Sequence, residues 1–340
     1  MALLKLPHIG KLENNIFIRT DNPLKEIWEH ILLLGDFHFL SKRWENQSTE
    51  TITTVSTSIK QAHEYFIASK SATLLTRPLL IYYCFICLAK AVLYLTENKP
   101  HDLHGLGQPE VSESLLDVSV TLKSKGIFPC LAEYLGYKYK SGQQISIEQF
   151  VVNVIELIES YERYYNKSGL VITPKVEVFL DGDINIFFES SLFGNKSSED
   201  FRALLERNTN LFDDFQEVEN ETGIELNIRN PIPKDRLNID GAALMKKHFS
   251  HSVYPDSRYY LNLHDEDIRV PSTLAYLGIM FTLGSIVRYY PKEIDRFLSD
   301  KNTSNIWFIQ QLCDCAERVF PNLMLNHYYN TNFIFAASSW

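Results

Sequence analysis

The stretch RPLLIYYCFICLAKAVLYL, residues 77–95, is the most apolar segment of this 340-residue chain. Its apolar run is near the lower length limit of a membrane span, about 17–25 residues, and it contains Lys90 and the tyrosines Tyr82 and Tyr83. A charged residue is costly in a bilayer, whereas in a protein its long stem can carry it to the surface. The stretch therefore predicts a buried core helix, and no contact with a membrane is expected.

Further helices are predicted on both sides of this core helix. Asp21, Asn22 and Pro23 form a helix start signal, because Asn is a favoured N-cap residue and Pro fits the first helical position. Apolar residues at helical spacing follow in PLKEIWEHILLLGDFHFLSKRW. Other helices are expected over residues 58–68, 76–94, 271–290 and 306–320.

The middle of the chain carries strand signals. LLDVSVTLK, residues 115–123, alternates as a half-buried strand does. In VEVFLDGDINIFFE, residues 176–189, Asp181 and Gly182 predict a hairpin with a two-residue type I′ turn, because such turns need positive φ angles. Ser146 and Gln149 are placed as a capping box at the start of a helix over residues 146–165. A helix over residues 198–215 and short strands over residues 224–228 and 259–263 complete the pattern.

The order of these elements predicts the fold class. We expect an α+β protein, mostly helical, in which an N-terminal helical bundle and C-terminal helices surround a small mixed or antiparallel sheet. Three regions follow: helical residues 1–112, a strand and helix region over residues 113–240, and helical residues 241–340 that pack on the first region.

The net charge of −9 is concentrated in one segment. Residues 1–150 carry 15 basic and 15 acidic residues, residues 151–240 carry 9 and 18, and residues 241–340 carry 9 of each. This balance argues against a broad grip on nucleic acid, which usually needs a basic surface, but it leaves a local basic site open. The acidic segment 151–240 is either a solvated face, a docking surface for a basic partner, or a phosphate-mimicking decoy.

The N-terminus and the cysteines indicate a cytoplasmic protein. Lys, Pro and Gly interrupt the apolar residues of MALLKLPHIGKLENN, so this segment does not predict a signal peptide. The five cysteines are an odd number, which is typical of free thiols in a reducing compartment.

Two separated blocks of the sequence carry a family resemblance. RPLLIYYCFICLAKAVLYL with the HGL of residues 104–106 resembles the N-terminal block of the YaaC-like family of bacterial proteins, and GSIVRYYP, residues 284–291, with the FPN of residues 320–322, resembles its C-terminal block. The blocks span roughly residues 20–330 and contain no catalytic signature. The helical bundle is also similar to HEPN-type domains, which occur in ribonuclease toxins and bacterial conflict systems.

The HEPN similarity implies one pair of catalytic candidates. HEPN ribonucleases show an Arg and a His separated by four to six residues, and Arg258 and His264 have this spacing. Residues six apart on a strand face the same way, whereas the HEPN motif belongs to helices. The alternative is an ordinary polar face of a strand. His104 is a third candidate.

Arg288 is the leading candidate for ligand binding. It lies at the expected C-terminal end of the helix over residues 271–290, beside Tyr289 and Tyr290 and one turn after Ser285. One interpretation is a structural Arg that caps the helix carbonyls or pairs with a carboxylate. The other is a platform of Arg288 and the tyrosines that holds a phosphate group or a base.

Lys90 and His104 are the other ligand-binding candidates. A buried lysine is costly unless paired, so Lys90 either reaches the surface or lies beside His104, where the two could bind an anion or carry protons. A ligand site is supported if Arg288, Tyr290, Lys90 and His104 line one concave pocket.

Neither a metal nor a cofactor is expected. Glu177, Asp181 and Asp183 suit a turn and a solvated strand better than a magnesium site, and the histidine pairs of HDLH and KKHFSH lack the adjacent glutamate of zinc proteases. The chain has no phosphate-binding glycine loop, dinucleotide fingerprint or hydrolase elbow.

The expected function is therefore binding. The family resemblance implies a cytosolic bacterial protein, and the HEPN similarity implies a role in a phage-defence or conflict assembly. A protein partner or homo-oligomer is expected, with nucleic acid or a nucleotide at a local site. The alternative is a metal-independent, HEPN-like ribonuclease.

Overall fold

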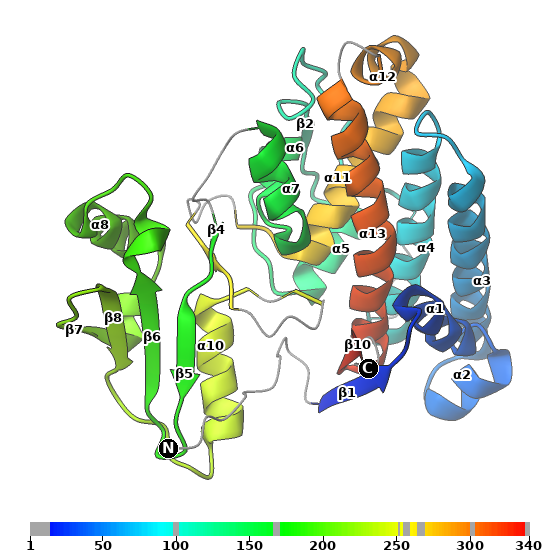
Figure 1. Ribbon diagram of the computed structural model, residues 1–340. Helices are drawn as coiled ribbons and strands as arrows, with labels where there is room; N and C mark the ends of the chain where they lie inside the picture. The colour runs from blue at the N-terminus through cyan, green and yellow to red at the C-terminus, as the bar shows by residue number, and fades with distance from the viewer. Residues whose placement is uncertain are drawn as a thin grey trace. The chain divides into compact units, whose positions relative to one another are not determined.

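The computed structural model describes residues 14–97, 102–165, 171–250, 252–253, 259–263, 269–299 and 303–336 (Figure 1). The chain forms two compact units. Unit 1 comprises Met1–Ile16, Asn166–Arg269 and Asn330–Ile334, and unit 2 comprises Phe17–Tyr165, Val270–Tyr329 and Phe335–Trp340. Both units are assembled from segments that are distant in sequence, whereas the three regions predicted above are consecutive.

The N-terminal helices of unit 2 begin where the sequence signals predict. They are α1 (Pro23–Leu33), α2 (Phe37–Arg43), α3 (Thr49–Ser71) and α4 (Arg77–Glu97). The Asn22 side chain accepts a hydrogen bond from the Lys25 amide, and Pro23 occupies the first turn of α1. Helix α3 begins well before the predicted residue 58.

Helix α4 is the core helix of unit 2 (Figure 1). Helices α3, α11 (Ser272–Tyr289) and α13 (Thr303–Tyr329) all pack on it. By length and composition Arg77–Thr96 could cross a membrane, but 67% of its apolar window is buried inside the protein. This burial is what the core-helix prediction requires.

Shorter elements complete unit 2. They are α5 (Ile127–Tyr134), α6 (Ile147–Val151), α7 (Ile155–Tyr165), α12 (Pro291–Phe297) and the antiparallel pair β2 (Ser119–Thr121) and β3 (Gln144–Ser146). The capping box of Ser146 and Gln149 is confirmed. The single helix predicted after it is wrong, because the helix is interrupted at Asn153. The Asn153 side chain donates a hydrogen bond to the Gln149 carbonyl and accepts one from the Val270 amide.

Unit 1 is built on a four-stranded antiparallel sheet in the order β5-β6-β8-β7. Its strands are β5 (Lys175–Val178), β6 (Ile184–Glu189), β7 (Phe215–Val218) and β8 (Gly223–Ile228). Helices α8 (Ser198–Asn208), α9 (Leu211–Asp214) and α10 (Ala242–His248) accompany it, as does the pair β4 (Val171–Ile172) and β9 (Leu261–Asn262). Ile184, Ile186 and Phe188 alternate into a core that also contains Phe201 and Leu205 of α8.

The hairpin of β5 and β6 is confirmed, but its turn is different from the prediction. Gly182 has a positive φ of 98°, whereas Asp181 does not have a positive φ. The Gly182 amide donates to the Phe179 carbonyl and the Phe179 amide to the Asp183 carbonyl, so the loop is longer than a two-residue type I′ turn.

Two predicted helix ends are also wrong. Residues 198–215 form α8 and α9, and Phe215 already pairs with Ile228 in the sheet. Helix α13 continues through Pro321, although the sequence predicts an end at Phe320. Beyond it, β10 (Thr331–Ala336) pairs with β1 (Asn14–Arg19), and neither strand is predicted by the sequence. The α+β class, mostly helical with small sheets, is confirmed.

Candidate functional site

A tight turn places His104 against two helices of unit 2. Gly105 has a φ of 84°, and a Cβ atom on it would lie 2.2 Å from Cδ of Pro129, so only glycine fits. The carbonyls of Leu103 and His104 accept hydrogen bonds from the Ile127 and Phe128 amides in the first turn of α5. These contacts satisfy amides that a helix start leaves unpaired, and they fix the turn.

The turn closes a pocket of about 120 Å³ between α4 and α11. The side chains that line it and can form polar or stacking contacts are Tyr82, Tyr83, His104, Gln108, Ser285, Arg288 and Tyr289. Gly284 lets the two helices approach, because a Cβ atom there would lie 3.3 Å from the Leu79 Cα atom. No acidic residue lines the pocket within the described part of the chain.

Arg288 lies exposed at the mouth of this pocket. Its Nη1 donates to the Tyr83 hydroxyl at 3.1 Å, and its guanidinium lies 4.9 Å from the centre of the Tyr289 ring. Among the described residues it forms no ion pair with a carboxylate. The guanidinium therefore keeps most of its donors available.

His104 lies deeper and is held by aromatic side chains. Its Nδ1 is 2.6 Å from the Tyr82 hydroxyl, and its ring lies 5.9 Å from that of Phe281. Burial lowers the pKa of His104, and the charges of Lys90 and Arg288 lower it further. Burial also raises the pKa of Tyr82, as does Tyr83, so Tyr82 keeps its proton. A neutral imidazole and a phenol thus share one hydrogen bond beside the cavity.

Ser285 contributes a hydroxyl to the wall of the same cavity. The residue is 7% exposed and lines the pocket. Within the described residues its hydroxyl makes no hydrogen bond. The hydroxyl can therefore donate to a ligand oxygen in the cavity.

The structure brings together four of the six residues that the sequence singles out for ligand binding. His104, Ser285, Arg288 and Tyr289 line one pocket. Tyr290 does not line it, since it ends α11 and precedes α12. Lys90 does not line it either, but its charge acts on His104. The catalytic candidates Arg258 and His264 lie outside the described residues.

Tyr82, Tyr83 and Phe281 are pocket residues that the sequence analysis missed. Tyr82 and Tyr83 stand out in the apolar segment of residues 77–95 as its adjacent hydroxyl-bearing residues. Adjacent positions on a helix point about 100° apart, so one tyrosine can enter the core while the other reaches the pocket mouth. The adjacent tyrosines in an apolar helix therefore indicate a site at this position, whereas nothing in the local sequence distinguishes Phe281 from a core residue.

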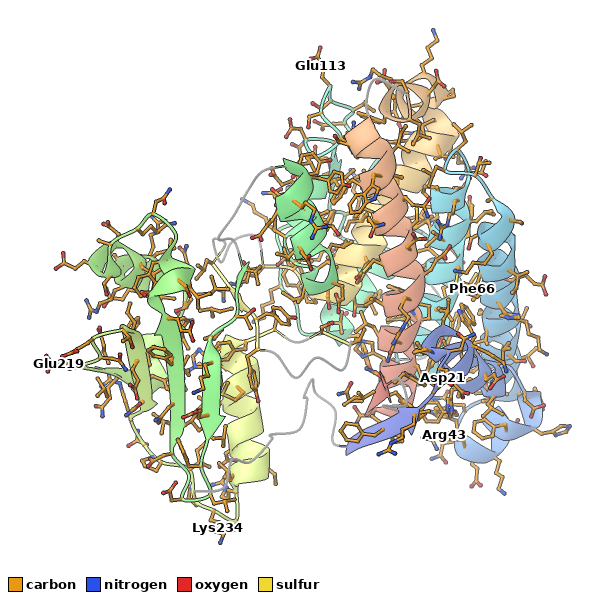
Figure 2. The ribbon with its side chains drawn as sticks, in the orientation of Figure 1. Asp21, Arg43, Phe66, Glu113, Glu219 and Lys234 are labelled. Atoms are coloured by element: carbon orange, nitrogen blue, oxygen red, sulfur yellow. The ribbon has the colours of Figure 1, made fainter. Side chains whose placement is uncertain are left out.

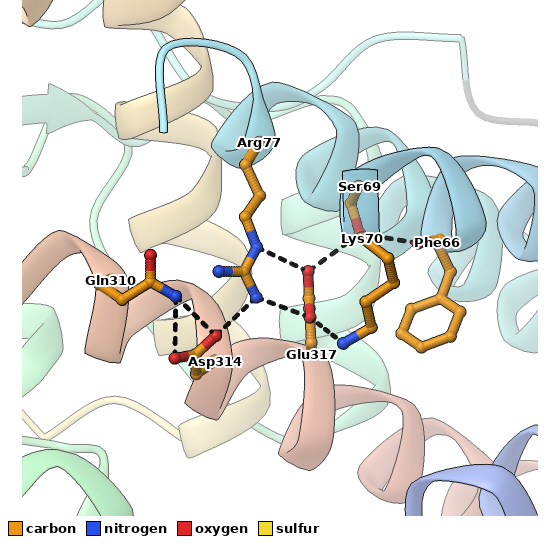
Figure 3. A network of polar contacts seen from close by, with 7 residues as sticks. All are labelled: Phe66, Ser69, Lys70, Arg77, Gln310, Asp314 and Glu317. Atoms are coloured by element: carbon orange, nitrogen blue, oxygen red, sulfur yellow. Dashed lines mark hydrogen bonds and ion pairs between the residues drawn. The ribbon is translucent and has the colours of Figure 1, made fainter. Parts of the chain in front are cut away.

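A second polar cluster in unit 2 is structural (Figure 3). Glu317 of α13 accepts hydrogen bonds from Ser69, Lys70 and Arg77, and Arg77 also donates to Asp314 at 2.6 Å. Burial lowers the pKa of Arg77, but its bonds to Glu317 and Asp314 raise it above its usual value. Every charge here has a partner, so the cluster joins α3, α4 and α13 and offers no free group.

The carboxylates of unit 1 form no metal-binding group of three within the described residues. Glu177 pairs with Lys175 at 2.9 Å on the sheet. Asp214 bonds His248 Nε2 at 2.7 Å, and burial lowers the pKa of His248 despite this bond. Glu219, after β7, points into solvent (Figure 2). These three carboxylates are therefore either paired or exposed to solvent.

Fold and pocket together define a mostly helical α+β protein with a small pocket that is lined by Arg288 and, among the described residues, by no carboxylate. The chain belongs to the YaaC-like protein family, whose sequence profile matches residues 33–328. The matched range contains every pocket residue. No curated protein and no solved structure matches the chain.

Proposed function

We propose that this YaaC-like protein acts by binding, and that the pocket between α4 and α11 holds a small anionic group such as phosphate. One observation carries the proposal: Arg288, the His104 imidazole and the unpartnered Ser285 hydroxyl face one cavity that has no acidic lining among the described residues. Arginine binds phosphate oxygens through its planar fork, and hydroxyl and imidazole N–H groups add neutral donors.

The local charge supports an anion over a cation. Lys90 and Arg288 both act on His104, and no carboxylate is among the charges that shift its pKa. Neither cation forms an ion pair with a described residue. An anion in the cavity would therefore gain attraction without first displacing an internal carboxylate.

Isothermal titration calorimetry with inorganic phosphate tests the proposal. We expect wild type to bind, and Arg288→Gln to bind about 10- to 100-fold more weakly, the loss expected for one charge-assisted hydrogen bond. Arg163→Gln is the matched control, because the Arg163 side chain is 68% exposed and, among the described residues, forms its ion pair with Glu159 on the same helix. No phosphate binding by wild type, or equal binding by all three proteins, refutes the proposal.

The alternative function is a metal-independent ribonuclease. It is favoured by the presence of a neutral imidazole, His104, in one pocket with Arg288, since such groups can move a proton and stabilise a phosphate. Cleavage of RNA by wild type but not by His104→Ala or His264→Ala would establish it. Intact RNA in every lane would eliminate it.

We further propose that the protein works in the cytoplasm within a larger assembly, such as a phage-defence system, or as a homo-oligomer. The family membership and the acidic segment 151–240 support this proposal, because an acidic surface suits a basic protein partner. Native mass spectrometry of the protein purified from its host tests it, and a lone monomer would contradict it.

A further inference from the structure

The pocket is too small to enclose a whole metabolite. Its volume of about 120 Å³ is well below the ~300–1,000 Å³ of sites that enclose drug-sized ligands. Only the head of a ligand, such as a phosphate group, fits beside His104 and Ser285. The remainder has to lie at the mouth, where its contacts depend on the residues exposed there.

Aromatic side chains and one cation form this mouth. The Tyr65 and Tyr83 rings stack with centroids 5.3 Å apart, the Tyr83 hydroxyl accepts from Arg288, and the Arg288 guanidinium lies over the Tyr289 ring. Tyr289 is 48% exposed. Within the described residues no other ring stacks on it. One face of Tyr289 thus contacts Arg288 while much of the ring is open to a ligand.

We propose that the ligand is a phosphate monoester that carries a planar base, namely a nucleotide, with its phosphate in the cavity and its base on Tyr289. This inference rests on the proposed function, since it needs the anion site. Stacking suits the base because every nucleobase has an aromatic face, and a neighbouring guanidinium strengthens such contacts. The lack of acidic residues in the lining favours a ligand without a positive charge.

Two sources share this chemistry, a free mononucleotide and the phosphorylated 5′ end of a nucleic acid strand. The open mouth suits both. The net charge of −9 disfavours a long backbone-binding surface, so at most the terminal nucleotide would be held.

Calorimetric titrations of the full chain with inorganic phosphate, ribose 5-phosphate, AMP and a 5′-phosphorylated dinucleotide test the inference. We expect AMP to bind about 5- to 150-fold more tightly than ribose 5-phosphate, the gain of one stacked base. Tyr289→Leu should remove this difference and leave phosphate affinity unchanged, whereas Tyr289→Phe, which keeps the ring, should retain it.

The outcomes separate the two proposals. Equal affinity for AMP and ribose 5-phosphate overturns the nucleotide inference and leaves the anion site standing. No binding of inorganic phosphate, ribose 5-phosphate or AMP overturns both. A dinucleotide as tight as AMP supports the strand end as the source, and a much weaker one supports the free nucleotide.

Discussion

At the scale of single residues, the Glu317 carboxylate holds three helices together. The Glu317 side chain is 2% exposed, and its two oxygens accept hydrogen bonds from Ser69, Lys70 and Arg77 (Figure 3). Removing one partner of a buried ion pair leaves the other charge desolvated and uncompensated. The network therefore affects the stability of the fold mainly because the loss of one partner leaves a buried charge without a counter-charge.

Glu317→Gln should lower the free energy of unfolding by about 3–5 kcal/mol, because Arg77 and Lys70 lose their buried counter-charge. Asp314→Asn is the matched control, since its side chain is 49% exposed, and it should cost about 0–1 kcal/mol. Urea unfolding measures both. Equal losses in the two variants would contradict this role of burial.

Two histidines should make stability depend on pH. His104 and His248 both have a pKa lowered by burial below the usual value of 6.5, so near and below that pH the unfolded chain binds more protons than the folded one. Stability should therefore fall as the pH falls through this range. The pKa of Asp214 is lowered below its usual 3.8, so the protonation of Asp214 affects stability only at lower pH.

Urea unfolding at about pH 5.5 and about pH 7.5 measures this effect, on either side of the ordinary histidine pKa. His104→Asn should show a smaller loss of stability on acidification than wild type. Bound phosphate should raise the pKa of His104, because an anion favours its charged form. Phosphate itself also gains a proton in this pH range, so the quantity to compare is the ratio of the phosphate affinity of wild type to that of His104→Asn, which should increase as the pH falls. A ratio that does not change with pH would contradict contact between the anion and His104.

At the scale of elements, the turn at Gly105 determines where His104 lies. Gly105→Ala should weaken phosphate binding and lower stability, because the new Cβ meets Pro129 and the φ of 84° is unfavourable for alanine. Gly142→Ala is the control: its φ is 90°, but no atom lies within 4 Å of the new Cβ. It should cost about 1–3 kcal/mol in stability and leave phosphate affinity unchanged.

The sequence predicted the helices whose apolar pattern and end signals agree. Asn22 and Pro23 predicted the start of α1, and the apolar run of residues 77–95 predicted α4. The start of α3 was missed because its threonine-rich first turns have low helix propensity, while buried Ile52 and Val55 stabilise them by packing. Strands β1 and β10 were missed because they lie near opposite ends of the chain, and a pairing between such distant segments leaves no signal in the local sequence.

The candidate site was predictable in part for the same reason. Arg288 and His104 are unusual in their local sequence, and both reach the pocket. The contribution of Tyr82 and Phe281 depends on how closely α4 and α11 approach at Gly284, which is a long-range property. Lys90 and Tyr290 have suitable chemistry, but neither lines the pocket.

At the scale of the whole molecule, the acidic charge and the candidate site belong to different units. Most of segment 151–240 lies in unit 1, whereas every pocket residue belongs to unit 2. Arg288 and Tyr83 meet although they are 205 positions apart in the sequence. The net charge of −9 is therefore shared between two units and is not the charge of unit 2 alone.

The most direct measurement is the location of an anion in crystals of the full chain. Tungstate, a heavy analogue of phosphate, gives an anomalous diffraction signal that identifies its position. We predict a peak within hydrogen-bonding distance of Arg288 and beside His104 in wild-type crystals, and its loss in crystals of Arg288→Gln. A pocket without a peak in wild-type crystals that hold tungstate elsewhere would contradict the account.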